Sequence, residues 1–279
     1  MFGINALIRT FDAIFRNRLA AFRICGFWFP FYVLVSNPWL LWEVTEGTAP
    51  YISRPMPQIV EDYYGWFFAL GFVLLIVSFV GIAIVAVGWH RFVLRGETPK
   101  SVLIWPKGWP IKRYFWTVVL LVLLGIPLFF LLHFRDFTSP EIALAADDGF
   151  SSYWGTVKTF LVWLLPSIFL GLVLPAIALG VKSTFSFSLS LTKQHFFSLL
   201  LLVIVLALIF PLPSVLIGEF IGPVTHIGEG ATGWLAFFLS MISSWVIILL
   251  EIGVLSEIYR SYRLPLAIGD QRSSLHLET

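Results

Sequence analysis

The chain has 279 residues, of which 58% are hydrophobic and only 12% are charged, and its formal net charge is +2. Soluble domains carry about 25% charged residues and nucleic-acid-binding proteins need a broad basic face, so a soluble enzyme and a nucleic-acid partner are both excluded. The single cysteine excludes an internal disulfide framework and a cysteine-ligated metal cluster.

Residues 1–23 are predicted to form an amphipathic helix that lies at the membrane interface. They have neither a continuous apolar core nor a small-residue cleavage site, so they do not form a signal peptide. We expect this helix to anchor the first span; the alternative is a helix that docks a partner or senses lipid. Its apolar face carries Leu7, Phe11, Ile14, Phe15, Leu19 and Phe22, and its polar face carries Asn5, Arg9, Asp12, Arg16 and Arg23.

Six apolar stretches follow, each long enough to cross a bilayer as a helix, which takes about 20 residues. They must be helical because lipid cannot pair backbone N–H and C=O groups. Pro30, Asn37 and Pro38 interrupt the first stretch, so the alternatives are a re-entrant first span or a five-span chain with its termini on opposite sides. The predicted spans are 24–42, 64–89, 114–134, 157–180, 197–220 and 234–256.

The distribution of Lys and Arg favours placing both termini in the cytoplasm. In that orientation the inner segments are 1–23, 90–113, 181–196 and a tail over 257–279, and together they hold 15 of the 18 basic residues. The outer loops hold only three basic residues but nine acidic ones. The sequence therefore predicts an all-α bundle of six transmembrane helices over 24–256, in a plasma membrane.

Two stretches at predicted inner span ends carry a family resemblance. Residues 88–99 read GWHRFVLRGETP, and residues 174–180 read LPAIALG, followed by SLSLTK over 188–193. Together they resemble uncharacterised six-helix bacterial inner-membrane proteins, a group similar to the membrane domain fused to some glycerophosphoryl diester phosphodiesterases. The sequence has no phosphodiesterase catalytic domain, so the resemblance implies a small helical membrane module without that activity.

Basic side chains at the inner ends of the second and sixth spans are the candidate binding residues. Arg91 and Arg95 are one helical turn apart, and Arg260 and Arg263 close the sixth span. Cations at this depth hold anionic lipid phosphates, so the sequence predicts a lipid-headgroup site there. The alternative is topological anchoring, in which an arginine and Trp89 mark the headgroup level.

Glu251, 17 residues into the sixth span, is the most unusual residue, because an acid inside a span is costly and predicts a partner. Arg91 and Arg260 are the expected partners, and structural pairing is favoured over proton or ion coupling. Glu257 is expected at the interface. His90 lies at a predicted span boundary and is expected to be a hydrogen-bonding surface residue rather than a ligand.

No catalytic motif is present, so no catalytic residue, cofactor or metal site is predicted. The leading hypothesis is a non-enzymatic integral membrane protein that acts as a scaffold, assembly factor or accessory subunit of a larger membrane complex. Its partners would be the lipid bilayer and either another membrane protein or a second copy of the chain. The alternative is a small transporter or lipid-handling protein that uses the proline-broken fourth and fifth spans and Glu251.

Overall fold

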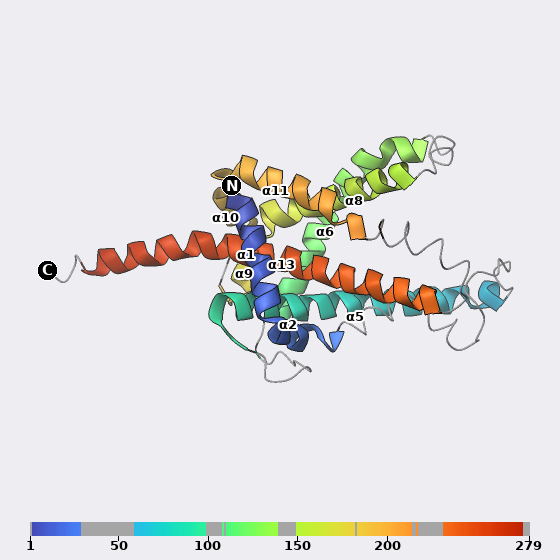
Figure 1. Ribbon diagram of the computed structural model, residues 1–279, viewed down its shortest axis with the longest axis horizontal. Coiled ribbons are helices and arrows are strands. Elements are labelled where there is room, and N and C mark those ends of the chain that lie inside the picture. Colours follow the sequence, from blue (N-terminus) through green and yellow to red (C-terminus); the bar gives the residue numbers. More distant parts are fainter. Residues whose placement is uncertain are drawn as a thin grey trace.

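The residues that the structure, a computed structural model, describes are mostly helical, and no strand occurs among them (Figure 1). Within this described part, four helices are long and apolar enough to cross a membrane, and a fifth is counted if one sharply bent helix pair forms a single span. The prediction of a helical chain with several apolar helices of membrane-spanning length is therefore confirmed. The described residues are 2–28, 59–98, 108, 110–138, 149–181, 183–213, 216 and 231–275.

The second, third, fourth and sixth predicted spans coincide with long helices. The first predicted span, 24–42, lies outside the described residues beyond residue 28. The four helices, each with its membrane-length apolar segment, are α5 (Ile59–Arg95, with Phe72–Arg95), α6 (Ile111–Thr138, with Ile111–Phe134), α8 (Gly149–Leu170, with Tyr153–Leu170) and α13 (Ala231–Leu275, with Ile242–Tyr262).

The fourth predicted span is broken near its end. α8 stops at Leu170, and a short helix, α9 (Val173–Ala178), begins after two residues. A Cβ atom on Gly171 would collide with the carbonyl oxygen of Ser167, so the turn between the helices requires glycine at this position. Every residue of α9 is buried, because this short helix packs between the longer helices α5, α6 and α13.

The fifth predicted span is preceded by a sharp bend. α10 (Phe185–Lys193) and α11 (Phe196–Ile209) are bent by 100° at their junction. Thr184 begins α10 as an N-cap, because its side-chain oxygen accepts the Phe187 N–H at 3.3 Å. α11 alone, at 14 residues, is shorter than the roughly 20 residues that a span needs.

Two N-terminal helices lie across the bundle. α1 (Phe2–Arg16) crosses α13 and reaches α11, and α2 (Arg18–Cys25) then packs against α5 (Figure 1). Gly253 of α13 lets α1 approach, because a Cβ there would collide with the Thr10 methyl group. The predicted apolar face is divided between two surroundings. Leu7 and Ile14 are buried against the bundle, whereas Phe11, Phe15, Leu19 and Phe22 are exposed.

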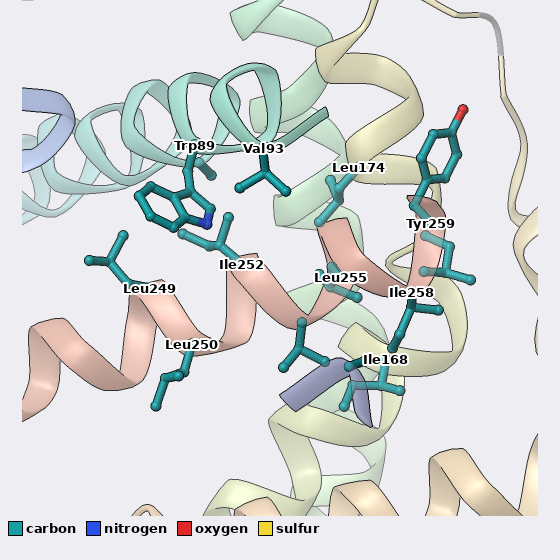
Figure 2. Close-up of a cluster of buried hydrophobic side chains, with 14 of the residues drawn as sticks. Trp89, Val93, Ile168, Leu174, Leu249, Leu250, Ile252, Leu255, Ile258 and Tyr259 are labelled. Carbon is teal, nitrogen blue, oxygen red and sulfur yellow. The ribbon is translucent and has the colours of Figure 1, made fainter. Parts of the chain in front are cut away.

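The hydrophobic core is concentrated at one end of the bundle, which we call the arginine end because Arg91, Arg95, Arg113 and Arg260 lie there. Figure 2 shows the α5 and α13 side chains meeting in this core, with Leu174 of α9 beside them. Toward the opposite ends of the helices large apolar side chains are exposed, among them Phe72, Phe130 and Phe238.

The predicted tail over 257–279 differs from the structure. The apolar segment of α13 extends to Tyr262, and the helix itself continues to Leu275, projecting past the arginine end (Figure 1). Residues 257–259 are buried in the bundle. The predicted boundary between the sixth span and the tail, at residue 256, therefore lies inside α13.

Candidate functional site at the arginine end

His90 is at the centre of a buried polar cluster formed by three long helices. Its Nδ1 atom lies 2.7 Å from Ser256 Oγ of α13, and its Nε2 atom lies 3.0 Å from the Tyr114 hydroxyl of α6. Both His90 and Ser256 have no exposed surface, and Tyr114 is 2% exposed. Three helices are thus joined through one imidazole ring in a region that is otherwise apolar.

The hydrogen-bond pattern indicates one tautomer of His90. The single hydroxyl proton of Ser256 is donated to the Ile252 carbonyl at 3.1 Å, so its oxygen is left to accept the Nδ1–H of His90. The Nε2 atom then has no proton and accepts the hydroxyl proton of Tyr114. A neutral imidazole therefore satisfies every polar atom of this contact, as a water-free environment demands.

Glu251 extends the cluster toward α8. Its carboxyl is hydrogen-bonded to Ser167 and lies close enough to Tyr114 for the two side chains to interact electrostatically. Neither residue is one of the arginines that the sequence suggested as partners. The Glu251 side chain is partly exposed. We refer to His90, Tyr114, Ser167, Glu251 and Ser256 as the His90 cluster.

Glu257, expected at the interface, is the buried acid, with 3% of its surface exposed. Its Oε1 atom accepts a hydrogen bond of 2.9 Å from Arg260, one helical turn further along α13. Arg260 also donates to the carbonyl oxygen of Val93, in the last turn of α5. Because the last carbonyls of a helix have no partner within it, Arg260 satisfies one of the unpaired carbonyl groups at the C-terminus of α5.

The C-terminus of α9 has a similar arrangement. The Gly180 N–H donates to the Ile177 carbonyl, and the Val181 N–H donates to the Ala176 carbonyl, which is the Schellman pattern. Gly180 takes the left-handed conformation this pattern requires, with φ of 79°. Two carbonyls at the end of the helix, those of Ala178 and Leu179, remain for other donors.

Arg91 and Arg95 supply those donors from α5. Arg91 donates to the Ala178 carbonyl at 3.3 Å, and Arg95 donates to the Leu179 carbonyl at 2.6 Å. Cations at a helix C-terminus also interact favourably with its dipole. Glu97 binds both arginines, at 2.8 Å and 3.5 Å, and the hydrogen bond from Arg91 holds the pKa of the Glu97 carboxyl below its ordinary value.

The predicted lipid-headgroup residues thus have partners within the chain. Arg91, Arg95 and Arg260 bind carbonyls and carboxylates of the protein itself, and the side chain of Arg263 lies outside the described part. Trp89, predicted at the headgroup level, has no exposed surface. The expectation that His90 is a surface residue was wrong, because its side chain has no exposed surface.

Sequence reasoning did not identify Tyr114, Ser167 and Ser256 as members of a site. The one available signal was His90 itself, a polar ring directly after a long apolar run. Within the described residues, no group of three or more His, Cys, Asp or Glu side chains is placed to hold a metal ion.

Comparison of the chain with protein-family models, with curated proteins and with solved structures found no match. The function must therefore be argued from the geometry alone.

Proposed function

We propose that the chain is a non-enzymatic integral membrane protein that acts as a scaffold, assembly factor or accessory subunit of a larger membrane complex. The observation that carries the proposal is the closure of the His90 cluster. His90 and Ser256 have no exposed surface, and both ring nitrogens of His90 are occupied by side chains of the protein. A substrate site requires polar groups that converge on an open cavity. This cluster instead holds helices together.

The cavity between α5, α13 and Trp28, which follows α2, supports the same proposal. It holds about 10 Å³, enough for about one water molecule, and Trp28, Gly81 and Trp245 are among its lining residues. Side chains that face outward on the described helices include many large apolar ones, such as Phe130 and Phe197. Lipid and neighbouring membrane helices are the partners that such surfaces contact.

The proposed setting is a bacterial inner membrane, with six spans and both termini in the cytoplasm. The bias of basic residues toward the segments at the arginine end supports this orientation. The resemblance to six-helix bacterial inner-membrane proteins supports the same setting. Cysteine labelling of intact cells tests it: a label near Asp147 should react only from the periplasm, and one near His276 only from the cytoplasm. The reverse result would contradict the orientation.

α1 and α2 are proposed to rest in the interface with their exposed aromatic side chains in lipid. Phe15 and Phe22, with 65% and 62% of their surface exposed, support this placement. Replacing Phe11, Phe15 and Phe22 by Asp should speed hydrogen exchange of residues 1–22 in vesicles, since the carboxylates disfavour apolar surroundings. Asn5→Asp/Arg9→Gln/Asn17→Asp, at exposed polar positions, makes the same change in net charge and is the matched control. Equal exchange in both variants would contradict the anchor.

The scaffold proposal predicts a stoichiometric partner. After mild solubilisation with native lipids, the tagged chain should run in size-exclusion chromatography above its monomer mass. Quantitative mass spectrometry should find either a fixed ratio to one membrane protein or a homo-oligomer. The same tag on an unrelated membrane protein controls for adventitious capture. A stable, lone monomer in native nanodiscs would contradict the proposal.

A small transporter is the second candidate, favoured by the break between α8 and α9 beside Ser167, the partner of Glu251. Broken helices near an intramembrane acid are typical of transport sites. Proteoliposomes containing a trapped pH-sensitive dye would show proton flux that Glu251→Gln abolishes and Glu97→Gln leaves intact. No flux above that of empty liposomes would count against ion coupling.

A further inference from the structure

A shallow groove runs along the first turns of α6 at the arginine end. Its volume of about 590 Å³ falls within the range of small-molecule sites, roughly 300–1,000 Å³. Positions 112, 116 and 120 are four residues apart and so share one face of the helix. The groove is lined by Pro110, Lys112, Arg113, Trp116, Thr117 and Leu120.

The lining changes from charged to apolar along α6. Lys112 and Arg113 are exposed at the helix start, Trp116 follows one turn later with 59% of its surface exposed, and Leu120 follows after another turn. At 1.5 Å per residue, Leu120 lies about 12 Å from Lys112 along the axis. Two cations, an indole ring and an aliphatic side chain therefore follow the order of phosphate, interface and acyl chain in a phospholipid leaflet.

The two cations of the groove lack acidic partners among the described residues. The other arginines of this end are paired with Glu97 and Glu257. Arg113 donates one hydrogen bond of 3.0 Å to the Ser183 carbonyl, which orients its guanidinium group without neutralising it. Lys112 has no hydrogen bond or ion pair to a described residue. A positive charge of two thus faces outward at the end of a spanning helix.

We propose that this groove binds the headgroup of an anionic phospholipid, with its phosphate on Lys112 and Arg113. Trp116 and Leu120 would contact the glycerol region and the upper acyl chain. The continuation of the site onto apolar side chains favours a lipid over free phosphate as the occupant. The inference depends on α6 crossing the bilayer and not on the scaffold function, so either can fail alone.

The test uses the full-length protein in mild detergent, titrated with phosphatidylglycerol or with phosphatidylcholine, and native mass spectrometry to count bound lipids. The double variant Lys112→Gln/Arg113→Gln should bind phosphatidylglycerol about 30-fold more weakly, or about fivefold for each cation removed. Its binding of phosphatidylcholine should not change. Arg18→Gln/Lys193→Gln makes the same change in net charge at exposed positions outside the groove and should leave both affinities unchanged.

Two further variants distinguish a lipid site from a loss of fold and from a site for free phosphate. Lys112→Arg/Arg113→Lys keeps both charges and should retain binding, which shows that the first variant loses charge rather than fold. Trp116→Ala should weaken binding of phosphatidylglycerol but not of inorganic phosphate. Equal affinity for the two lipids, an equal loss in the control variant, or no effect of Trp116→Ala would each overturn the proposal.

Discussion

Replacing His90 by Ala should destabilise the bundle more than replacing any half-buried histidine. The substitution removes two hydrogen bonds that link α5 to α13 and to α6, of 2.7 and 3.0 Å. Hydrogen bonds between helices in membrane proteins contribute about 0.6 kcal/mol on average and at most about 1.7 kcal/mol. Two such bonds therefore contribute roughly 1–3 kcal/mol, and the cavity left by the ring adds to this loss.

Cys25 provides the assay for this prediction. It is the single cysteine of the chain and is 4% exposed, so a maleimide reaches its thiol only when the helices separate. The labelling rate across a detergent–SDS series gives the unfolding free energy of each variant. His133→Ala is the control, because His133 is half-buried and its Nδ1–H donates to the Phe129 carbonyl within its own helix. Its one polar contact to another described helix, 3.4 Å from Nε2 to the Thr159 hydroxyl of α8, is long, and that hydroxyl already donates to the Gly155 carbonyl. His133→Ala should lower the unfolding free energy by less than about 1 kcal/mol.

A double-mutant cycle isolates the bond between His90 and Ser256 from the effect of the cavity. His90→Ala combined with Ser256→Ala should show a coupling energy between about 0.6 and 1.7 kcal/mol. The second substitution then costs little, since its partner is already absent. Additivity within about 0.3 kcal/mol, or equal costs for His90→Ala and His133→Ala, would refute the role assigned to this cluster.

Three further predictions concern the contacts around the cluster. Gly253→Ala should destabilise the protein by about 1–3 kcal/mol in the Cys25 assay, because the added Cβ collides with Thr10. Combining it with Thr10→Ala should relieve most of this loss. Gly155→Ala, at a position with open space around it, is the control and should be neutral or stabilising. The pKa of the Glu97 carboxyl in the folded protein lies below its ordinary 4.5. The contribution of Glu97 to the stability of the fold is therefore complete above about pH 4.5 and is lost as the pH falls through the pKa of the folded state. Glu97→Gln should flatten that part of the melting-temperature profile, and an unchanged profile would contradict the ion pair. Arg95→Gln should accelerate amide exchange in 173–181, whereas Arg16→Gln should not, as measured by mass spectrometry.

The spanning helices could be predicted from the sequence because lipid imposes its requirements on each segment separately. An apolar run must be helical and of a given length, whatever its neighbours are. The contacts between helices do not follow from such local rules. His90 meets partners 24 and 166 residues away, and that pairing depends on how three helices are rotated and aligned in the bundle.

Two sets of contacts that the sequence interpretation did not predict have identifiable physical causes. The protein acceptors of the arginines at the end of α5 were not predicted, because none is visible nearby in the sequence. The break at Gly171 turns α9 underneath them and presents the Ala178 and Leu179 carbonyls. Gly180, directly after an apolar stretch, was the available signal of a helix terminus there. Arg91 and Arg260 were expected as partners of Glu251, whereas Ser167 and Tyr114 lie beside it, because the rotation of α6 and α8 in the bundle cannot be predicted from the sequence of α13.

The hydrogen bonds from the arginines of α5 to the C-terminus of α9 have a consequence for biosynthesis. Arg91 donates to the Ala178 carbonyl, which lies 87 residues later in the chain. Because chains are synthesised at about 5–20 residues per second, Arg91 is made roughly 4–17 s before this acceptor. During that interval the guanidinium groups must stay hydrated or bound to headgroups. Insertion of α5 and closure of this end are therefore separate events, and a nascent chain arrested before residue 178 would display its arginines to the surrounding medium.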